Sequence, residues 1–268
     1  MREALAEFFG TTVLITFGIG VVAQTVLSSN GAGSPLGIHL CWGLAVILGV
    51  YASAGVSGAH LNPAVTLALA LRRGFPWSRV GPYVIAQVLG AFVGAAIVYL
   101  TYREAFAAFD GGIRQIAGAQ GTAGIFSTYP AAYLSTLGGF IDQVVGTALL
   151  VAAVFAFTDE RNAPPPAGLT PVLVGLTVMA IGMAFGVNAG YAINPARDFG
   201  PRLFTSLAGW GSGVFTAANG YWWVPIVAPC VGAVLGGTAY DLCVRDRHPA
   251  QTNRIADPAQ RAEKKSRA

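Results

Sequence analysis

The sequence predicts an all-α membrane protein in which six transmembrane helices and two shorter re-entrant half-helices form an inverted 3+3 repeat. Three observations support this fold class. Of the 268 residues, 54% are hydrophobic and only 10% are charged, whereas about 25% of the residues in a soluble domain are charged. Six apolar runs approach the ~20 residues that a helix needs to cross a bilayer. The tripeptide Asn-Pro-Ala occurs twice, and each copy ends a long apolar stretch.

The six candidate spans share this length and a near absence of charge, and they cover residues 5–27, 36–55, 80–102, 136–158, 168–188 and 221–243. Two further apolar pieces, 63–71 and 195–207, follow the two tripeptides and are too short to cross, so we expect them to re-enter from opposite sides. A transmembrane β-barrel is excluded, because it would show short segments of alternating polarity instead.

The two tripeptides, Asn62-Pro63-Ala64 and Asn194-Pro195-Ala196, predict two helix starts. Asn at an N-cap followed by Pro at the first helical position is a strong start signal. The Asn side-chain oxygen caps its own half-helix, which leaves the amide NH2 free to donate into a pore. Two helix N-termini aimed at one place put positive potential at the midplane, which favours permeants with oxygen acceptors and repels cations, including hydronium. The matched pair therefore predicts a pore or a transport site.

The two halves of the chain repeat. The tripeptides lie 132 positions apart, and the pair Gly90 and Gly94 in the third span matches Gly232 and Gly236 in the sixth. Such Gly-xxx-Gly pairs indicate close helix crossings. An odd number of spans in each half inverts the second half relative to the first. We expect a first repeat at 1–103, a long external connection packed as a lid or vestibule wall at 104–135, a second repeat at 136–243 and a basic cytoplasmic tail at 244–268.

The net charge of +4 does not indicate nucleic-acid binding, because seven of the 16 Lys and Arg residues lie in the C-terminal tail. With both termini in the cytoplasm, twelve of these residues face inward. The other four, Arg103, Arg114, Arg197 and Arg202, face outward. This bias satisfies the positive-inside rule. We therefore expect a multi-pass protein of the plasma (inner) membrane with cytoplasmic N and C termini, surrounded by lipid.

Several motifs resemble the major intrinsic protein family, which comprises the aquaporins and the glycerol facilitators. They are the two tripeptides, the Ser-Gly-Ala-His-Leu lead-in at 57–61, and Arg197 directly after the second tripeptide. The similarity covers nearly the whole chain from Glu7 to Asp241. It implies an aquaporin-like fold and a homotetramer in which each protomer has its own passive pore without a cofactor.

The resemblance also implies a selectivity filter at Trp42, Tyr191 and Arg197. Water-selective members carry Phe and His at the first two positions, whereas glycerol facilitators resemble the Trp and the aromatic residue of this chain. Two aromatic faces form an apolar wedge for a carbon backbone, opposite donors that take its hydroxyl groups. Tyr191 departs from the Phe of many glycerol facilitators, and its hydroxyl either faces the pore or points to a partner elsewhere. Asp198 is a further feature of the glycerol branch, expected to pair with Arg197 or the loop, or to cap the half-helix.

The unwound segments before the two tripeptides are expected to line the path with backbone carbonyl groups. These belong to Gly58, Ala59, His60, Gly190, Tyr191 and Ala192. In the family, Glu7 supports the first segment by accepting backbone N–H bonds. Its repeat mate Gln143 keeps an acceptor oxygen but lacks the charge, so we expect weaker support for the second segment. The His60 ring is expected to be fixed in its loop, and it has no partner at metal-ligand spacing.

These features predict a channel for glycerol and related small uncharged polyols, together with water, that excludes protons and ions and is not an enzyme. The alternative is a water-selective aquaporin of the same fold. An ion-coupled transporter would need titratable pairs near the midplane, and the spans offer little apart from Glu7 and Asp142. An intramembrane enzyme would need a nucleophile with its base, and the sequence has no such group.

Overall fold

The computed structural model describes residues 1–166 and 168–249. Six helices are long and apolar enough to cross a membrane, the last within the helical stretch Gly213–Arg247. They are α1 (Arg2–Leu27), α2 (Pro35–Ser57), α4 (Trp77–Thr101), α6 (Thr136–Thr158), α7 (Thr170–Ala189) and α10 (Val224–Cys243). The predicted six spans are confirmed, and each bound falls within a few residues of the expected one.

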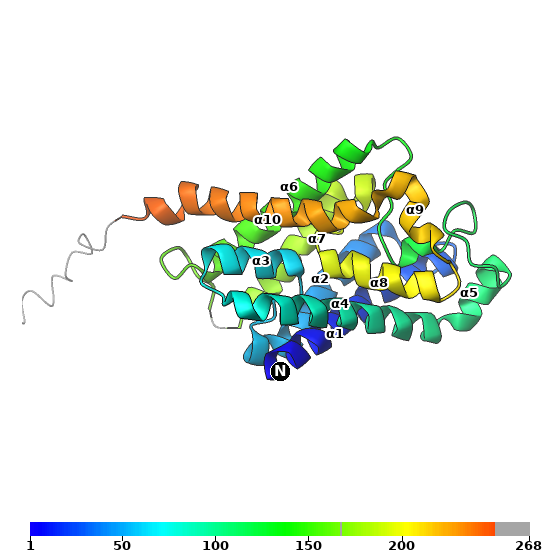
Figure 1. The fold of residues 1–268 in the computed structure, drawn as a ribbon, viewed down its shortest axis with the longest axis horizontal. Helices are drawn as coiled ribbons and strands as arrows, with labels where there is room; N and C mark the ends of the chain where they lie inside the picture. Colours follow the sequence, from blue (N-terminus) through cyan, green and yellow to red (C-terminus); the bar gives the residue numbers. More distant parts are fainter. Residues whose placement is uncertain (167, 250–268) are drawn as a thin grey trace, which may run out of the picture.

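Two shorter helices, α3 (Pro63–Arg72) and α8 (Pro195–Leu207), begin at the prolines of the two tripeptides. Figure 1 shows α3 and α8 in line with each other, with their N-terminal ends facing. Neither helix is long enough to cross a bilayer, since ten or thirteen residues rise only about 15–20 Å. The two half-helices together therefore replace one crossing.

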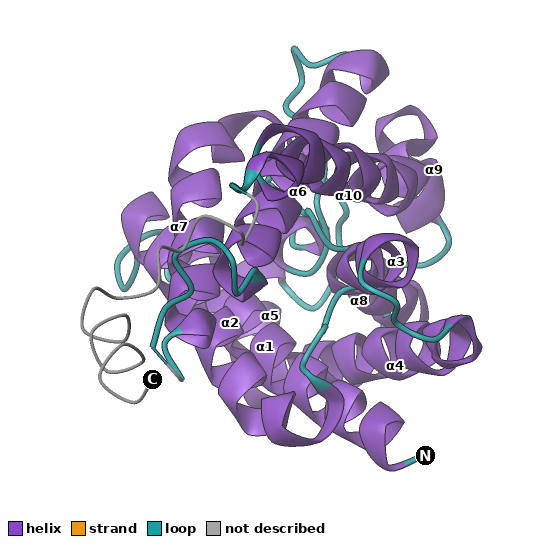
Figure 2. Ribbon diagram, turned by 90° about the vertical axis from the view of Figure 1, so that its left-hand side faces the viewer, coloured by secondary structure: helices purple, strands orange, loops and turns teal. Residues whose placement is uncertain are grey.

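The six long helices and the two half-helices form one ring, in which α3 and α8 lie between α4 and α10 (Figure 2). In the first half α1 packs against α2 and α4, and in the second half α6 packs against α7 and α10. The contact of α2 with α7 joins the halves on one side of the ring. On the other side α8 packs against α4 and α3 packs against α10, so each half-helix lies against a span of the other repeat. Each helix of the first half therefore has neighbours that correspond to those of its counterpart in the second half, as an inverted repeat requires.

Glycine allows the closest of these crossings. A methyl group at Gly90 of α4 would overlap the carbonyl oxygen of Phe8 in α1, and one at Gly232 of α10 would overlap that of Val144 in α6. Helices in lipid gain much of their association energy from such close backbone packing. The close crossings expected from the two Gly-xxx-Gly pairs are confirmed.

The external connection is packed onto the helices. It contains α5 (Arg103–Asp110) and a 3-10 turn at Ala123–Ile125. Phe106 and Phe126 are fully buried and stack on each other with ring centroids 5.6 Å apart. A second external segment forms α9 (Gly213–Gly220) and a turn at Tyr221–Trp223, and a last turn at Arg245–Arg247 follows α10. Of the predicted basic tail, residues 250–268 lie outside the described residues.

Candidate functional site

The two half-helices meet through their capping asparagines. The Asn62 side-chain oxygen accepts the N–H of Ala64 at 2.9 Å, and the Asn194 oxygen accepts the N–H groups of Ala196 and Arg197 at 3.0 and 3.2 Å. Pro63 and Pro195 occupy the first helical position, where a missing N–H costs nothing. The N-terminal ends of both helix dipoles, which carry partial positive charge, therefore point at the same place inside the ring.

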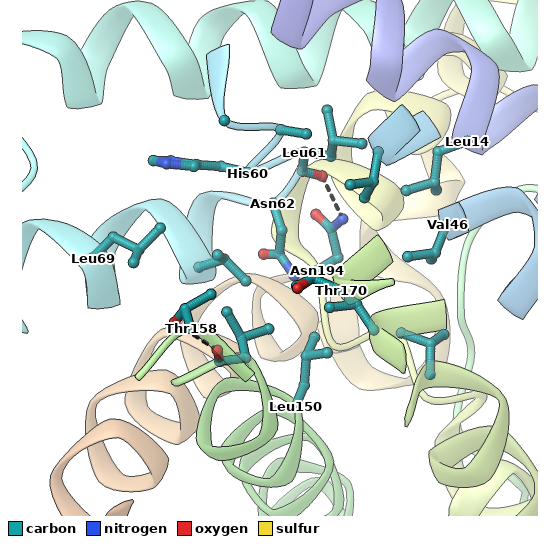
Figure 3. A pocket seen from close by; sticks show the side chains of 17 residues that line it. Leu14, Val46, His60, Leu61, Asn62, Leu69, Leu150, Thr158, Thr170 and Asn194 are labelled. Carbon is teal, nitrogen blue, oxygen red and sulfur yellow. Dashed lines mark hydrogen bonds between the residues drawn. The ribbon is translucent and has the colours of Figure 1, made fainter. Parts of the chain in front are cut away.

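Each asparagine amide also donates to the opposite loop. The Asn62 side-chain nitrogen donates to the carbonyl oxygen of Ile193 at 2.8 Å, and the Asn194 nitrogen donates to that of Leu61 at 2.8 Å. Figure 3 shows the second of these bonds. The prediction that the whole NH2 group is free for a permeant was therefore wrong. One N–H of each amide ties the loops together, because a buried carbonyl needs a partner, and the second N–H remains for a permeant.

Glu7 holds the first unwound segment. Its side chain is fully buried in α1, and its two oxygens accept the N–H groups of His60 and Leu61 at 2.9 and 2.7 Å. The side chains of Ser57 and Gln87 donate to the same carboxylate, each at 2.7 Å. Four donors around one buried carboxylate satisfy its acceptor sites, which is the condition under which such a charge is tolerated.

Gln143 occupies the matching place in the second repeat with fewer bonds to its segment. Its oxygen accepts the N–H of Ile193 at 2.9 Å, while its nitrogen donates to the carbonyl of Ala189 at 3.4 Å. The neighbouring Asp142 does not substitute for it, since that carboxylate accepts from the Asn188 side chain at 3.1 Å. Gln143 thus supplies one acceptor to the backbone of its segment where Glu7 supplies two.

The unwound segments run in alternating backbone conformations that leave carbonyl groups unpaired. Ala59 and Leu61 have φ of +50°, and Tyr191 and Ile193 have φ of +36° and +43°. Carbonyls in such segments cannot follow a helical pattern. Among the described residues, none of the six predicted pore carbonyls accepts a hydrogen bond from the protein; they belong to Gly58, Ala59, His60, Gly190, Tyr191 and Ala192. These acceptors are free to face a permeant.

Two adjacent cavities lie beside the asparagines Asn62 and Asn194. The larger, of about 190 Å³, extends from Thr158 and Thr170 at the ends of α6 and α7 to Asn62 and Asn194 (Figure 3). The smaller, of about 40 Å³, continues from Asn194 to Trp42 and Arg197. Their walls are largely apolar and share five residues: Leu14, Val46, Leu150, Val178 and Asn194. The path narrows towards Trp42 and Arg197.

Trp42 and Arg197 form the narrow end. The Arg197 guanidinium lies over the Trp42 ring with 4.2 Å from its central carbon to the ring centroid, and it donates to the carbonyl of Phe126 at 2.9 Å. Both side chains are more than nine-tenths buried. Tyr191 is not among the residues that line this cavity, and its hydroxyl lies 2.9 Å from Nδ1 of His39. Of the two orientations left open by the sequence, the structure has the hydroxyl pointing away to a partner.

Asp198 does not pair with Arg197. Its carboxylate accepts the N–H and the hydroxyl of Thr128, each at 2.6 Å, and lies 2.9 Å from the guanidinium of Arg202. Arg202 also donates to the carbonyls of Thr128 and Val214 at 2.7 and 2.8 Å. Asp198 therefore fixes the external connection to α8.

Arg202 belongs to the group of outward-facing cations predicted from the sequence, yet it is only 1% exposed. The sequence signal that could have identified its partner is the i, i+4 spacing of Asp198 and Arg202 on one half-helix. Phe126 and Thr128 lie in a stretch, 126–130, that resembles the glycerol branch, but their partners are at least 70 positions away. His39 has no comparable signal, because its partner Tyr191 is 152 positions away.

The His60 ring is held in place. Its Nδ1 lies 3.1 Å from the hydroxyl of Thr66, and the ring packs against Phe75 and Tyr83 with centroids 4.6 and 5.0 Å away. Within residues 1–166 and 168–249, no group of three or more His, Cys, Asp or Glu side chains could hold a metal ion.

Comparisons with known proteins agree with this geometry. The model of the major intrinsic protein family matches residues 1–240. The chain is 49% identical to human aquaporin-9 over 248 residues, which are 92% of this chain and 84% of that protein. It is also 49% identical to aquaglyceroporin-2 of Rhizophagus irregularis over 240 residues, which are 90% of this chain and 76% of that protein.

A solved structure has the same fold. The X-ray structure of the aquaglyceroporin from Plasmodium falciparum superposes with a TM-score of 0.81 at 36% sequence identity, and the match covers 90% of this chain and 95% of that one. The chain is therefore a multi-pass integral membrane protein that belongs to the major intrinsic protein family, in its aquaglyceroporin branch.

Proposed function

We propose that this protein is a passive transmembrane channel for glycerol and related small uncharged polyols, and for water, that excludes protons and ions. The observation that carries the proposal is the narrow end of the path, where an aromatic face and a guanidinium meet. Trp42 and Arg197 both line this end of the path: the indole supplies apolar surface for a carbon backbone, and the Arg197 N–H groups that are not bound to the Phe126 carbonyl supply donors for hydroxyl oxygens. An amphipathic permeant such as glycerol suits this pairing.

The selectivity filter in this proposal consists of Trp42, Tyr191 and Arg197. Tyr191 is assigned to the filter by the family resemblance; it adjoins the narrow cavity through Ala192, and its hydroxyl is bound to His39 rather than turned towards the permeant. A lumen-facing hydroxyl would make the filter narrower and more polar, and the bond to His39 prevents this. This orientation favours polyols over the alternative of a water-selective aquaporin.

Proton exclusion is assigned to the meeting point of the half-helices. Asn62, Pro63, Ala64 and their counterparts Asn194, Pro195 and Ala196 place two positive dipole ends at one level of the path. A permeating water accepts the remaining amide N–H and is oriented by it, while a hydronium ion or a metal cation is repelled. Of the residues with free carbonyls, Gly58, Ala59 and His60 line the larger cavity and Ala192 lines the smaller one, so acceptors continue the path on both sides of the asparagines.

The assembly in this proposal is a homotetramer, each protomer containing one pore. Support comes from exposed leucine-rich ridges at every fourth residue of two helices: Leu36, Leu40, Leu44 and Leu48 on α2, and Leu137, Ile141, Val145 and Leu149 on α6. Ridges of this spacing pack into the grooves of another helix. Cross-linking in the membrane tests this, and bands no larger than a monomer would contradict it.

We place the protein in the plasma (inner) membrane with both termini in the cytoplasm. Six crossings return the chain to the side on which it began, and the excess of Lys and Arg selects the cytoplasmic side. Cys243 is exposed at the C-terminal end of α10, the last crossing. A membrane-impermeant maleimide should label Cys243 in inverted vesicles and leave it unlabelled in right-side-out vesicles; the reverse pattern would contradict this orientation.

The experiment that tests the function is stopped-flow light scattering on proteoliposomes exposed to a glycerol gradient. We expect rapid osmotic shrinkage followed by reswelling much faster than in empty liposomes. Fast shrinkage with reswelling no faster than in empty liposomes would instead establish the water-selective alternative.

A further inference from the structure

We infer that His39 is a specificity-determining positioning residue: it holds the Tyr191 hydroxyl away from the permeant and so keeps a polar group out of the filter. This inference rests on the proposed function. It assigns a role to a residue of α2 that does not line the described path. The chemistry involved is a single hydrogen bond between an imidazole nitrogen and a phenol.

The first support is the contact itself. The Tyr191 oxygen lies 2.9 Å from His39 Nδ1, and the ring centroids are 5.3 Å apart with planes tilted by 52°. A neutral imidazole with its proton on Nε2 has a free lone pair at Nδ1, so it accepts the phenol O–H. Tyr191 is 7% exposed, and among the described residues its hydroxyl has no other hydrogen-bond partner. The imidazole thus satisfies a group whose burial without a partner is costly.

The second support is that α7 provides space for this pair of rings. A methyl group at Gly182 would lie 2.7 Å from the Tyr191 ring and 2.9 Å from His39 Nδ1, and one at Gly186 would lie 3.0 and 3.1 Å from the same two rings. Two glycines one turn apart therefore form a slot that fits the tyrosine together with its histidine. A larger residue at either position would push the rings apart.

The third support is the place of His39 beside the filter. His39 precedes Trp42 by three residues on α2, so the two side chains lie on neighbouring turns of one helix face. Trp42 lines the narrow cavity with Arg197, and Tyr191 adjoins that cavity through the next residue, Ala192. A change in the direction of the Tyr191 hydroxyl therefore acts at the narrowest part of the path.

Without the imidazole, the Tyr191 hydroxyl can find a hydrogen-bond partner only in the lumen of the pore. There the hydroxyl binds water or a permeant oxygen, and the filter becomes narrower and more polar. Glycerol then loses part of its contact with apolar surface in the filter, whereas water gains a hydrogen-bond partner there. We therefore expect His39→Ala to lower the ratio of glycerol to water permeability about fivefold to tenfold, the effect of roughly one hydrogen bond on a barrier.

The test is a double-mutant cycle on that ratio, measured in proteoliposomes with wild type, His39→Ala, Tyr191→Phe and the double variant. Tyr191→Phe and the double variant should have the same ratio as each other, because neither contains the hydroxyl that His39 directs. His39→Asn should restore the ratio, since its side-chain oxygen takes the place of Nδ1. Cys41→Ala is the matched control from the same helix, and its ratio should equal that of wild type.

An equal loss from His39→Ala with and without the Tyr191 hydroxyl would overturn the inference, because His39 would then act only through packing. An unchanged ratio in His39→Ala would overturn it as well. Wild-type glycerol flux at the level of empty liposomes would contradict the proposed function instead. In that case the same cycle, evaluated on water permeability, still tests the coupling, and additive effects would refute it.

Discussion

At the scale of single residues, Trp42 supplies the apolar surface of the filter and Arg197 supplies its hydrogen-bond donors. The guanidinium rests on the indole face at 4.2 Å, so each side chain limits the position of the other. A cation over an aromatic face is stabilised most where water is excluded. The opening available to a permeant is set by the indole, because Arg197 is tied to the Phe126 carbonyl.

Removing the indole should widen the filter. We expect Trp42→Ala to raise the uptake of five-carbon polyols relative to glycerol by roughly tenfold, which corresponds to a barrier lower by ~1.4 kcal/mol. Stopped-flow reswelling in each solute measures this ratio. Trp77→Ala, a truncation of an exposed tryptophan at the start of α4, is the control. An unchanged ratio in Trp42→Ala would refute the assignment of Trp42 to the filter.

Glu7 acts on the backbone rather than on the permeant. Replacing it with Gln substitutes an NH2 group for an oxygen that accepts from two of four donors, so donors face donors inside the ring. We expect Glu7→Gln to cost roughly 1–3 kcal/mol and to lower the midpoint of thermal unfolding in detergent by roughly 2–10 °C. Glu3→Gln on the same helix breaks only an exposed pair with Arg79 and should change the midpoint little. Equal midpoints for the two variants would contradict this role of Glu7.

At the scale of elements, a buried ion pair within α8, Asp198 with Arg202, holds the external connection through hydrogen bonds of both side chains to Thr128. Asp198 is fully buried and Arg202 is 1% exposed. Arg202 also lies over the Tyr129 ring at 4.6 Å. Burial raises the pKa of the Tyr129 phenol, so this ring is neutral at physiological pH. The connection carries the Phe126 carbonyl that binds Arg197, so the ion pair also determines the position of the filter arginine.

Breaking this pair should release the connection. Asp198→Asn leaves a buried guanidinium without a counter-charge, which costs roughly 3–5 kcal/mol. Removing both charges in Asp198→Asn/Arg202→Met should recover part of that loss. Thermal unfolding and limited proteolysis within residues 104–135 report both effects. If the losses of unfolding free energy from Asp198→Asn and from Arg202→Met simply add in the double variant, the two side chains are independent and the pairing is contradicted.

At the scale of the whole molecule, hydrophobic runs and helix-start signals were sufficient to predict the six spans and the two half-helices, whereas their arrangement was expected from the family resemblance. Asn-Pro defined the starts of α3 and α8 because capping is a local interaction. The crossed bonds between the loops could not be predicted, since they join residues 131 and 133 positions apart. The same holds for His39 and Tyr191, which are 152 positions apart and meet only when α2 packs on α7.

The central claim of this account is that the molecule passes uncharged polyols while the paired half-helix ends exclude protons. Its most direct test is one set of proteoliposomes loaded with a pH-sensitive dye and exposed to a glycerol gradient and a pH gradient together. We predict reswelling much faster than in empty liposomes, with the internal pH changing no faster than in those liposomes. A pH gradient that collapses at a rate set by the amount of channel, or reswelling no faster than in empty liposomes, would contradict the account.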